Sequence, residues 1–296
     1  MEVDEQTVED FWEHHACGDA LVGGLKERFG GDYEKFFSDY DQFRYSLERH
    51  LPACFDALGL SGERVLEVGL GQGADSESLI RRGARWSGVD LTAESVERVR
   101  TRLTLRDLPF ERLEQGSVLD LPFPDGIFDM VFSHGVLHHV PEIRQAQQEI
   151  HRVLRPGGEL VVMLYSRWSL NYLVSIGIVR RIGLLTAYPL DRLGLLTERR
   201  TDGILGDHLA NARRLGLFRY LRLREFTHHN TDGPANPYAL VYDRKKIERD
   251  FPSFRITQTY KRFMHAPPLP VHGLPGGSLL GWHLWAHLSP QDKAGS

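Results

Sequence analysis

Residues 65–73, which read V-L-E-V-G-L-G-Q-G, decide the fold of this 296-residue chain. Apolar residues on both sides of one carboxylate, Glu67, predict a buried β-strand. Glycines at positions 69, 71 and 73 then predict a tight turn into a helix, because residues without a Cβ adopt strained dihedral angles and let a ligand approach the backbone closely. We therefore expect a molecule with a ribose or a carboxylate to bind at this turn.

The overall composition is that of an ordinary folded protein. Hydrophobic residues make up 41% of the chain and charged residues 26%, which are typical shares for a globular protein with a substantial core. The formal net charge of −4 provides no general basic field for a nucleic acid. We therefore expect a globular protein that does not bind nucleic acids through its overall charge.

Few features of the sequence indicate secretion or a membrane. The two cysteines, Cys17 and Cys54, have no C-x-x-C spacing, so we expect neither a disulfide framework nor a cysteine zinc site, and a cytoplasmic location. The acidic start M-E-V-D-E-Q lacks the basic and apolar regions of a signal peptide. The most apolar run, 170–179, ends at Arg180 and Arg181, so we expect no stable membrane insertion.

Strand-like and helix-like segments alternate after the glycine turn. The expected strands are 65–68, 85–90, 110–117, 127–134 and 159–165, and the expected helices are 75–82, 92–103 and 141–153. This alternation predicts an α/β fold with a doubly wound parallel sheet. In such a sheet the ligand lies at the carboxyl ends of the strands, where the glycine turn, Asp90, Ser117 and His134 emerge.

The segments on either side of this core have a different pattern. The expected organisation is an N-terminal helical cap over 1–60, a cofactor-binding core over 61–166, a helical insertion over 167–250 and final strands over 251–296. Arg44 lies on an amphipathic helix of the cap, where it is either a solvated charge or a cation for a ligand carboxylate. Within the insertion, turn-forming residues over 226–238 predict a long ordered loop.

Five blocks of sequence resemble the class I S-adenosylmethionine-dependent methyltransferases. They are E-V-G-L-G-Q-G at 67–73, G-V-D at 88–90, G-S-V-L-D-L-P-F at 116–123, F-D-M-V-F-S-H-G-V-L-H-H-V at 128–140 and L-R-P-G-G at 154–158. The L-P-F and L-H-H-V words resemble the small-molecule branch that includes quinone-biosynthesis methyltransferases. The resemblance implies a Rossmann-like sheet of seven mostly parallel strands, in which the last two are antiparallel.

The resemblance also implies which residues bind the cofactor, S-adenosylmethionine. The expected cofactor-binding residues are Arg44, Glu67, Gly69, Leu70, Gly71, Gly73, Asp90, Leu91, Ser117, Val118 and His134. The glycines would lie under the methionine portion, and Asp90 would accept hydrogen bonds from the ribose hydroxyls. Ser117 departs from the aspartate that the family often has at this position. Its hydroxyl would accept a weaker bond from the adenine amino group, because the bond is not charge-assisted.

The acceptor of the methyl group is less well defined by the sequence. Alignment of the acceptor with the sulfonium, with water excluded, can supply much of the rate, and a base is needed only for a protonated acceptor. His138 and His139 follow the fourth strand, where they either serve as that base or make structural hydrogen bonds. The other candidates for the acceptor pocket are Tyr165, His228, His229, Asp232 and His265.

A metal site formed by the histidines is the alternative that we weighed for these residues. His134, His138 and His139, with His228 and His229, offer imidazole nitrogens that first-row metals prefer. No carboxylate or cysteine occurs at a recognisable ligand spacing from them. The sequence therefore predicts no metal site.

The resulting hypothesis is an S-adenosylmethionine-dependent methyltransferase that acts on a small, partly apolar molecule at oxygen, nitrogen or carbon. The glycine pattern alone also permits a nicotinamide-dependent oxidoreductase. A non-catalytic relative that binds a membrane or a partner through its helical insertion is a further alternative. A nucleic-acid methyltransferase is disfavoured, because S-H-G-V replaces the N-P-P-Y-like motif after the fourth strand. The oligomeric state is left open.

Overall fold

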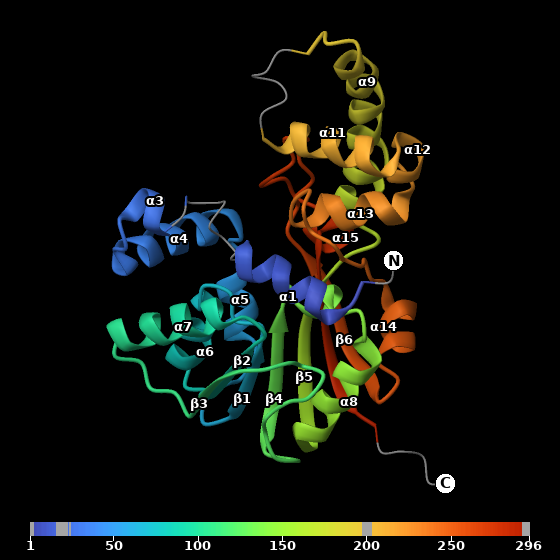
Figure 1. Ribbon diagram of the computed structural model, residues 1–296. Coiled ribbons are helices and arrows are strands. Elements are labelled where there is room, and N and C mark those ends of the chain that lie inside the picture. Colours follow the sequence, from blue (N-terminus) through green and yellow to red (C-terminus); the bar gives the residue numbers. More distant parts are fainter. Residues whose placement is uncertain (1–2, 16–22, 24, 197–202, 292–296) are drawn as a thin grey trace.

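The computed structural model describes residues 3–15, 23, 25–196 and 203–291 (Figure 1). The described strands form one seven-stranded sheet in the order β3-β2-β1-β4-β5-β7-β6. They are β1 (Arg64–Val68), β2 (Arg85–Asp90), β3 (Arg112–Gln115), β4 (Phe128–His134), β5 (Leu154–Tyr165), β6 (Phe254–Arg262) and β7 (His283–Pro290). The first five strands are parallel, and β7 is antiparallel to both β5 and β6. The predicted class I fold is confirmed.

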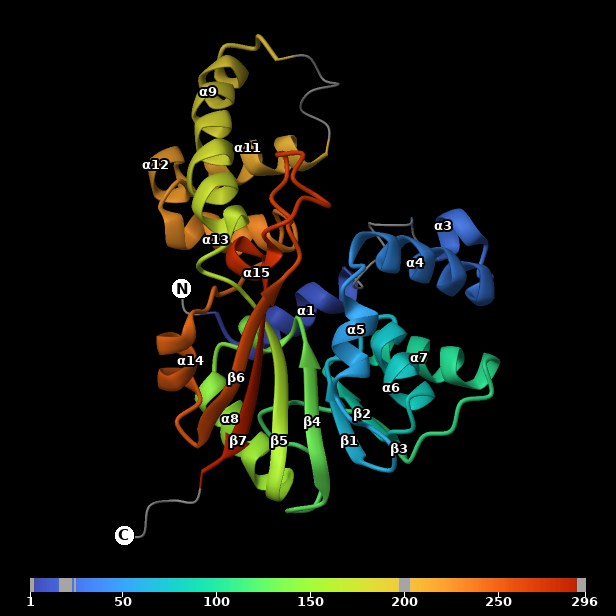
Figure 2. The ribbon, with the colours of Figure 1, turned by 180° about the vertical axis from the view of Figure 1, so that it is seen from behind.

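Helices cover both faces of the sheet. The core helices are α5 (Leu51–Asp56), α6 (Ala74–Arg81), α7 (Ala93–Leu105), α8 (Ile143–Val153) and α14 (Arg244–Asp250). Val65 of β1 belongs to the apolar cluster that includes α5, α6 and α7, whereas its neighbour Leu66 belongs to the cluster that includes α8 and α14. Because side chains alternate along a strand, the continuous apolar run of β1 serves both faces. Figures 1 and 2 show these two helical layers on opposite sides of the sheet.

The N-terminal helices lie close to the carboxyl end of the sheet. They are α1 (Glu5–His14), α3 (Leu25–Phe29) and α4 (Tyr33–Leu47). Phe36, Phe37 and Tyr40 are buried on one side of α4, as the amphipathic pattern predicts. In both views α1 lies across the carboxyl ends of β4 and β5 (Figures 1 and 2). Cys17 falls outside the described residues, and Cys54 is a buried thiol.

The insertion after β5 extends beyond the carboxyl edge of the sheet in both views (Figures 1 and 2). Its elements are η2 (Asn171–Val179, a π-helix), α9 (Arg180–Arg192), α11 (Ile204–Leu215), α12 (Leu217–Tyr220) and α13 (Leu223–Thr231); α15 (Gly277–Leu280) follows β6. The 3₁₀-helix η1 (Leu137–His139) follows β4. The helix formed by η2 and α9, Asn171–Arg192, is long and apolar enough to cross a membrane, judged by its length and composition alone.

The loop expected over 226–238 was wrong in its first half, because α13 continues to Thr231. Thr227 Oγ1 donates to the carbonyl of Leu223, and Asn230 Nδ2 donates to the carbonyl of Phe226. Threonine and asparagine side chains usually compete for the backbone hydrogen bonds of a helix, but here they donate to carbonyl groups of the preceding turn and leave the helix intact. Asp232 follows directly as the C-cap residue, at the end of this helix that faces the core.

Candidate active site

A cavity of about 320 Å³ lies where the glycine turn meets α1 and α4. The sequence-predicted residues that line it are Arg44, Gly69, Leu70, Gly71, Asp90, Leu91, Val118, His134, His139, Tyr165 and Asp232. The predicted residues that do not line this cavity are Glu67, Gly73, Ser117, His138, His228, His229 and His265. The cavity therefore combines most of the expected cofactor residues with three of the expected acceptor or catalytic residues.

The glycine turn is held in shape by Asp90 at the end of β2. Asp90 Oδ2 accepts from the backbone N–H of Leu70 at 2.6 Å, and Oδ1 accepts from the N–H of Thr92 at 2.9 Å. Gly69 has a φ of 80°, and a Cβ there would lie 2.2 Å from Cγ2 of Val136. Any other residue at position 69 would displace the loop that follows β4. Burial raises the pKa of Asp90, although the hydrogen bonds to Leu70 and Thr92 oppose the shift.

Next to the turn, Arg44 joins a buried charged cluster. Its Nη2 donates to Asp75 Oδ2 at 2.8 Å, and its Nε donates to Glu48 Oε2 at 3.1 Å. His134 Nδ1 lies 2.7 Å from the same Asp75 oxygen. Burial raises the pKa of Asp75, but the Arg44 guanidinium and His134 outweigh it and hold the pKa well below its usual range. The cluster therefore places a fixed cation and a fixed anion at the wall of the cavity.

Glu67 and Gly73 lie beside the turn without reaching the cavity. Glu67 is 1% exposed, and its Oε2 accepts from Trp86 Nε1 at 2.8 Å. Burial, with the charge of Asp75, raises the pKa of Glu67 to about 8. The Glu67 carboxyl group therefore keeps its proton at pH 7, and its hydrogen bond with Trp86 joins β1 to β2 below the turn. Gly73 is the N-cap of α6 with a φ of 75°, so its contribution is the start of that helix.

Ser117 does not line the cavity, and its side chain bonds to the N-terminal helix. Its hydroxyl donates to Glu5 Oε1 at 2.5 Å and accepts from the N–H of Leu119. Glu5 itself lines the cavity, together with Val8 and Trp12 of the same helix. Sequence reasoning missed these three residues, because they precede the glycine turn by more than 50 positions. The only local signal is Asp4, which caps α1 by accepting from the N–H of Thr7.

At the other end of the cavity, His139 meets Asp232 and Tyr165. His139 Nε2 lies 3.2 Å from Asp232 Oδ2, and the Tyr165 hydroxyl donates to Asp232 Oδ1 at 2.6 Å. His139 Nδ1 lies 2.6 Å from the carbonyl oxygen of Tyr238. Trp12 of α1 packs edge-on against the His139 ring, with centroids 5.3 Å apart. Two residues from the core and one from α13 thus form a polar end to a largely apolar cavity.

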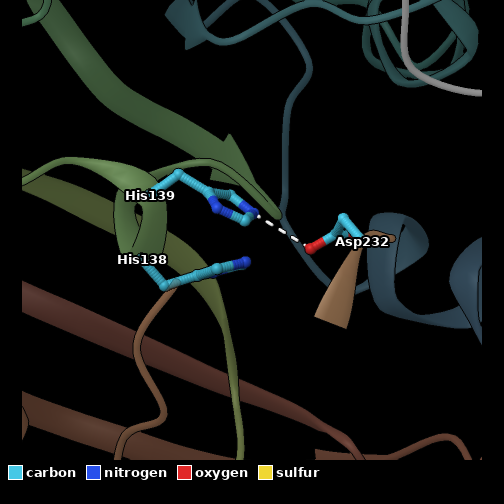
Figure 3. Close-up of side chains that lie close together, drawn as sticks. All are labelled: His138, His139 and Asp232. Atoms are coloured by element: carbon cyan, nitrogen blue, oxygen red, sulfur yellow. Dashed lines mark ion pairs between the residues drawn. The ribbon is translucent and has the colours of Figure 1, made fainter. Parts of the chain in front are cut away.

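His138 lies directly behind this group and is fully buried. Its ring is 3.9 Å from that of Tyr165, centroid to centroid, and neither ring nitrogen has a hydrogen-bond partner among the described residues. Burial, with the neighbouring His139, holds the pKa of His138 well below 6.5. The imidazole is therefore neutral at pH 7. Figure 3 shows its nitrogens directed toward the side on which His139 and Asp232 lie.

The three remaining histidines predicted for the acceptor pocket make structural contacts. His228 Nδ1 lies 2.8 Å from the carbonyl oxygen of Ala239, and His229 Nδ1 lies 2.8 Å from that of Pro234. His265 stacks on Phe263, and burial lowers its pKa to about 4. The contacts of His228 and His229 hold the insertion together, and His265 packs in the segment that follows β6; none of the three lines the cavity.

Comparison with known proteins agrees with the fold. Residues 66–162 match the family model described as a methyltransferase domain. These residues form a methyltransferase domain. A fatty-acid O-methyltransferase of Mycolicibacterium smegmatis is 38% identical over 117 residues, which are 39% of this chain and 41% of that protein. A demethylmenaquinone methyltransferase of Tropheryma whipplei is 38% identical over 106 residues, 36% of this chain and 43% of that protein. The chain thus spans about two fifths of these relatives' length.

Solved structures share the fold of the methyltransferase domain and its neighbouring elements. The geranyl diphosphate C-methyltransferase of Streptomyces coelicolor superposes with a TM-score of 0.53 at 13% identity and covers 97% of each chain. An S-adenosylmethionine-dependent methyltransferase of Aquifex aeolicus superposes with a TM-score of 0.51 at 14% identity, covering 87% of this chain and 97% of that one. Identities this low show the shared fold alone.

Proposed function

We propose that this chain transfers the methyl group of S-adenosylmethionine to a small, partly apolar molecule. The observation that carries the proposal is the cavity in which the glycine turn of the methyltransferase domain, tied to Asp90, faces a polar group formed by His139, Tyr165 and Asp232. The end with the glycine turn and Asp90 offers the groups that a nucleoside needs. The end with the polar side chains offers groups that can hold a methyl acceptor. The acceptor atom, oxygen, nitrogen or carbon, is open.

The residues at the glycine turn fit the cofactor. Asp90 accepts three hydrogen bonds, from the N–H of Leu70 and from the N–H and the hydroxyl of Thr92. Because a carboxylate has about four lone-pair sites, Oδ2 can also accept from a ribose hydroxyl. Gly69 and Gly71 line the cavity without side chains, so backbone can approach the methionine portion. Arg44 is the cation nearest to that portion on the cavity wall, where it would face the ligand carboxylate.

We further propose that Glu5 takes the place of the aspartate that this chain lacks at Ser117. The carboxylate of Glu5 lines the cavity and is held by the Ser117 hydroxyl. A carboxylate accepts a charge-assisted hydrogen bond from an adenine amino group, whereas a hydroxyl alone makes a weaker one. Leu91 and Val118 line the same end of the cavity and would contact the adenine faces. The closing of α1 over the cofactor would thus contribute to its recognition.

The bound sulfonium supplies an activated methyl group, so the chain has to align the acceptor and exclude water. Val136, Met163 and Trp12 supply apolar surface to the cavity wall. Of the two histidines proposed as a base, His139 has the better position, because it lines the cavity. His138 lies behind it with its pKa held well below 6.5, so it is a poor base.

Small, partly apolar acceptors are supported by the cavity lining and by the names of the similar proteins, which act on fatty acids and demethylmenaquinone. We propose no nucleic-acid partner, in line with the net charge of −4. We also propose a cytoplasmic protein without stable membrane insertion. Arg180 interrupts the apolar helix and donates to the carbonyl oxygens of Asn230 on α13 and of Pro267 in the segment after β6. Flotation with liposomes tests this point, and co-migration would contradict it.

The direct test of the function is a product. The purified chain is incubated with methyl-labelled S-adenosylmethionine and fractions of a cell extract, and labelled products are identified by mass spectrometry. The proposal predicts a labelled small molecule that extracts into an organic solvent. Label only in nucleic acid or protein, or in nothing, would contradict it. Titration of reduced nicotinamide cofactor, followed by fluorescence, tests the oxidoreductase alternative, for which we expect no change.

A further inference from the structure

His138, His139 and Asp232 form a compact cluster of possible metal ligands (Figure 3). One ligand atom of each residue lies within 4.8 Å of the other two. Ligands that share one ion at 2.0–2.2 Å lie roughly 3.4 Å apart in a tetrahedral arrangement, so a shift of about 1 Å would bring all three onto one ion. The sequence concealed this cluster, because Asp232 follows the histidines by more than 90 positions.

The hydrogen bonds of His139 suit a metal ligand. A carbonyl oxygen can only accept, so the contact of 2.6 Å to Tyr238 requires a proton on Nδ1. Nε2 lies 3.2 Å from a carboxylate oxygen of Asp232 without hydrogen-bond geometry, so no hydrogen bond among the described residues holds it. An ion between this nitrogen and the carboxylate oxygen would be coordinated by both atoms. A backbone carbonyl on Nδ1 is also the usual partner that orients a histidine ligand.

His138 is the second, independent observation. Its side chain is fully buried, and both ring nitrogens lack a hydrogen-bond partner among the described residues. A buried polar atom without a partner costs about 1–3 kcal/mol, so such groups call for an explanation. The ring is directed to the side where His139 and Asp232 lie (Figure 3). Coordination of an ion would satisfy one of these nitrogens.

We propose that His138, His139 and Asp232 bind one divalent first-row transition-metal ion, such as Zn²⁺, Mn²⁺ or Fe²⁺. Two imidazoles and one carboxylate are a ligand set that these ions accept, and three protein ligands leave coordination positions open. Asp232 Oδ1 is held by the Tyr165 hydroxyl, which leaves Oδ2 for the ion. His139 and Asp232 line the cavity, so the open positions face its interior.

The use of this ion rests on the proposed methyl transfer. With the ion bound, His139 is a ligand and does not act as the base. An acceptor hydroxyl bound at an open position would instead release its proton to solvent more readily, because the ion stabilises the oxygen anion. That oxygen would then form a bond to the methyl carbon, while the electron pair of the breaking carbon–sulfur bond stays on sulfur. A carboxylate acceptor would bind at the same positions without releasing a proton. The site thus favours acceptors that present an oxygen.

The test measures metal binding by the full chain, without an assay of activity. Protein freed of metal with a chelator is titrated calorimetrically with Zn²⁺ and Mn²⁺, and Co²⁺ is used as an absorption probe of the ligands. The variants are His139→Gln and Asp232→Asn, and the matched control is His151→Gln on α8. Thermal unfolding of each variant shows that it is folded. His138→Gln is added, but the two variants above decide the test because His138 is the most buried.

We expect one ion per chain in the unaltered protein and in His151→Gln, with at least tenfold weaker binding in His139→Gln and Asp232→Asn. Absence of binding, or equal binding by all folded variants, would overturn the proposal. S-adenosylhomocysteine is titrated separately into metal-free protein. If it binds while no metal does, the metal site alone is refuted. If metal binds and this compound does not, the metal site stands and the proposed function is refuted.

Discussion

The carboxylate of Asp90 accepts a 2.6 Å hydrogen bond from the backbone N–H of Leu70, which joins the end of β2 to the glycine turn after β1. The same carboxylate fixes Thr92, the N-cap of α7. One partly buried side chain therefore shapes the turn and faces the space proposed for the ribose. A change at this position should affect the shape of the site and its contact with the ligand together.

Asp90→Ala should lower the affinity for S-adenosylhomocysteine at least 100-fold, about 2.7 kcal/mol, because the turn and the ribose lose the same acceptor. His138→Ala should change this affinity less than tenfold, since His138 does not line the cavity. Calorimetric titration of both variants gives the comparison. The reverse order of effects would show that the ribose partner is assigned to the wrong residue.

Glu5→Gln should weaken binding of S-adenosylhomocysteine about threefold to tenfold, because an amide oxygen accepts a weaker bond than a carboxylate from an adenine amino group. Asp10→Asn is the matched control on the same helix, with its side chain on the exposed side. Inosine analogues of the cofactor lack the amino group and should bind both proteins equally. Equal losses for Glu5→Gln and Asp10→Asn would instead indicate a general effect of charge.

Glu67 should make stability fall as pH rises. Its pKa is about 8 in the folded chain and 4.5 in its ordinary state, so the folded form keeps the proton between these values. The stabilisation is complete below pH 4.5 and is lost as pH rises through 8, with a slope that approaches about 1.4 kcal/mol per pH unit. Urea unfolding of the unaltered chain and of Glu67→Gln measures the difference. A difference that stays constant with pH would contradict the neutral carboxyl group.

Arg44→Met should lower the free energy of unfolding by about 3–5 kcal/mol, because it leaves the buried carboxylate of Asp75 without its cation. The two side chains are only 14% and 8% exposed. Adding Asp75→Asn to the same protein should recover part of the loss. Arg81→Met is the control: Arg81 is 54% exposed, and its partner Glu77 keeps its pair with Arg102, so this change should cost less than about 1 kcal/mol. Similar losses for both arginines would contradict the coupling.

The core of the site was predictable from the sequence because its residues emerge from neighbouring strands of the sheet, β2, β1 and β4. The glycine turn, Asp90 and His134 each lie at the end of a parallel strand, and the sheet brings these ends together. Contacts between distant segments were not predictable. Glu5 approaches Ser117 over 112 positions, and Tyr165 reaches Asp232 over 67.

The histidines of the insertion show a second limit of the sequence. A histidine that faces a cavity and one that bonds a backbone carbonyl look alike in the sequence, since the same residue type serves both purposes. His139 lines the cavity, whereas His228 and His229 bond carbonyl groups of their own insertion. His228 and His229 lie on α13, and the direction of their side chains depends on that helix. The turn-forming residues of this segment made the helix hard to predict.

The central claim is that the cavity at the glycine turn binds S-adenosylmethionine. The most direct test is calorimetric titration of S-adenosylmethionine and S-adenosylhomocysteine into the purified, unaltered chain. We predict binding of one molecule of either compound per chain, with a negative heat-capacity change because apolar surface becomes buried. If neither compound binds, the claim is contradicted.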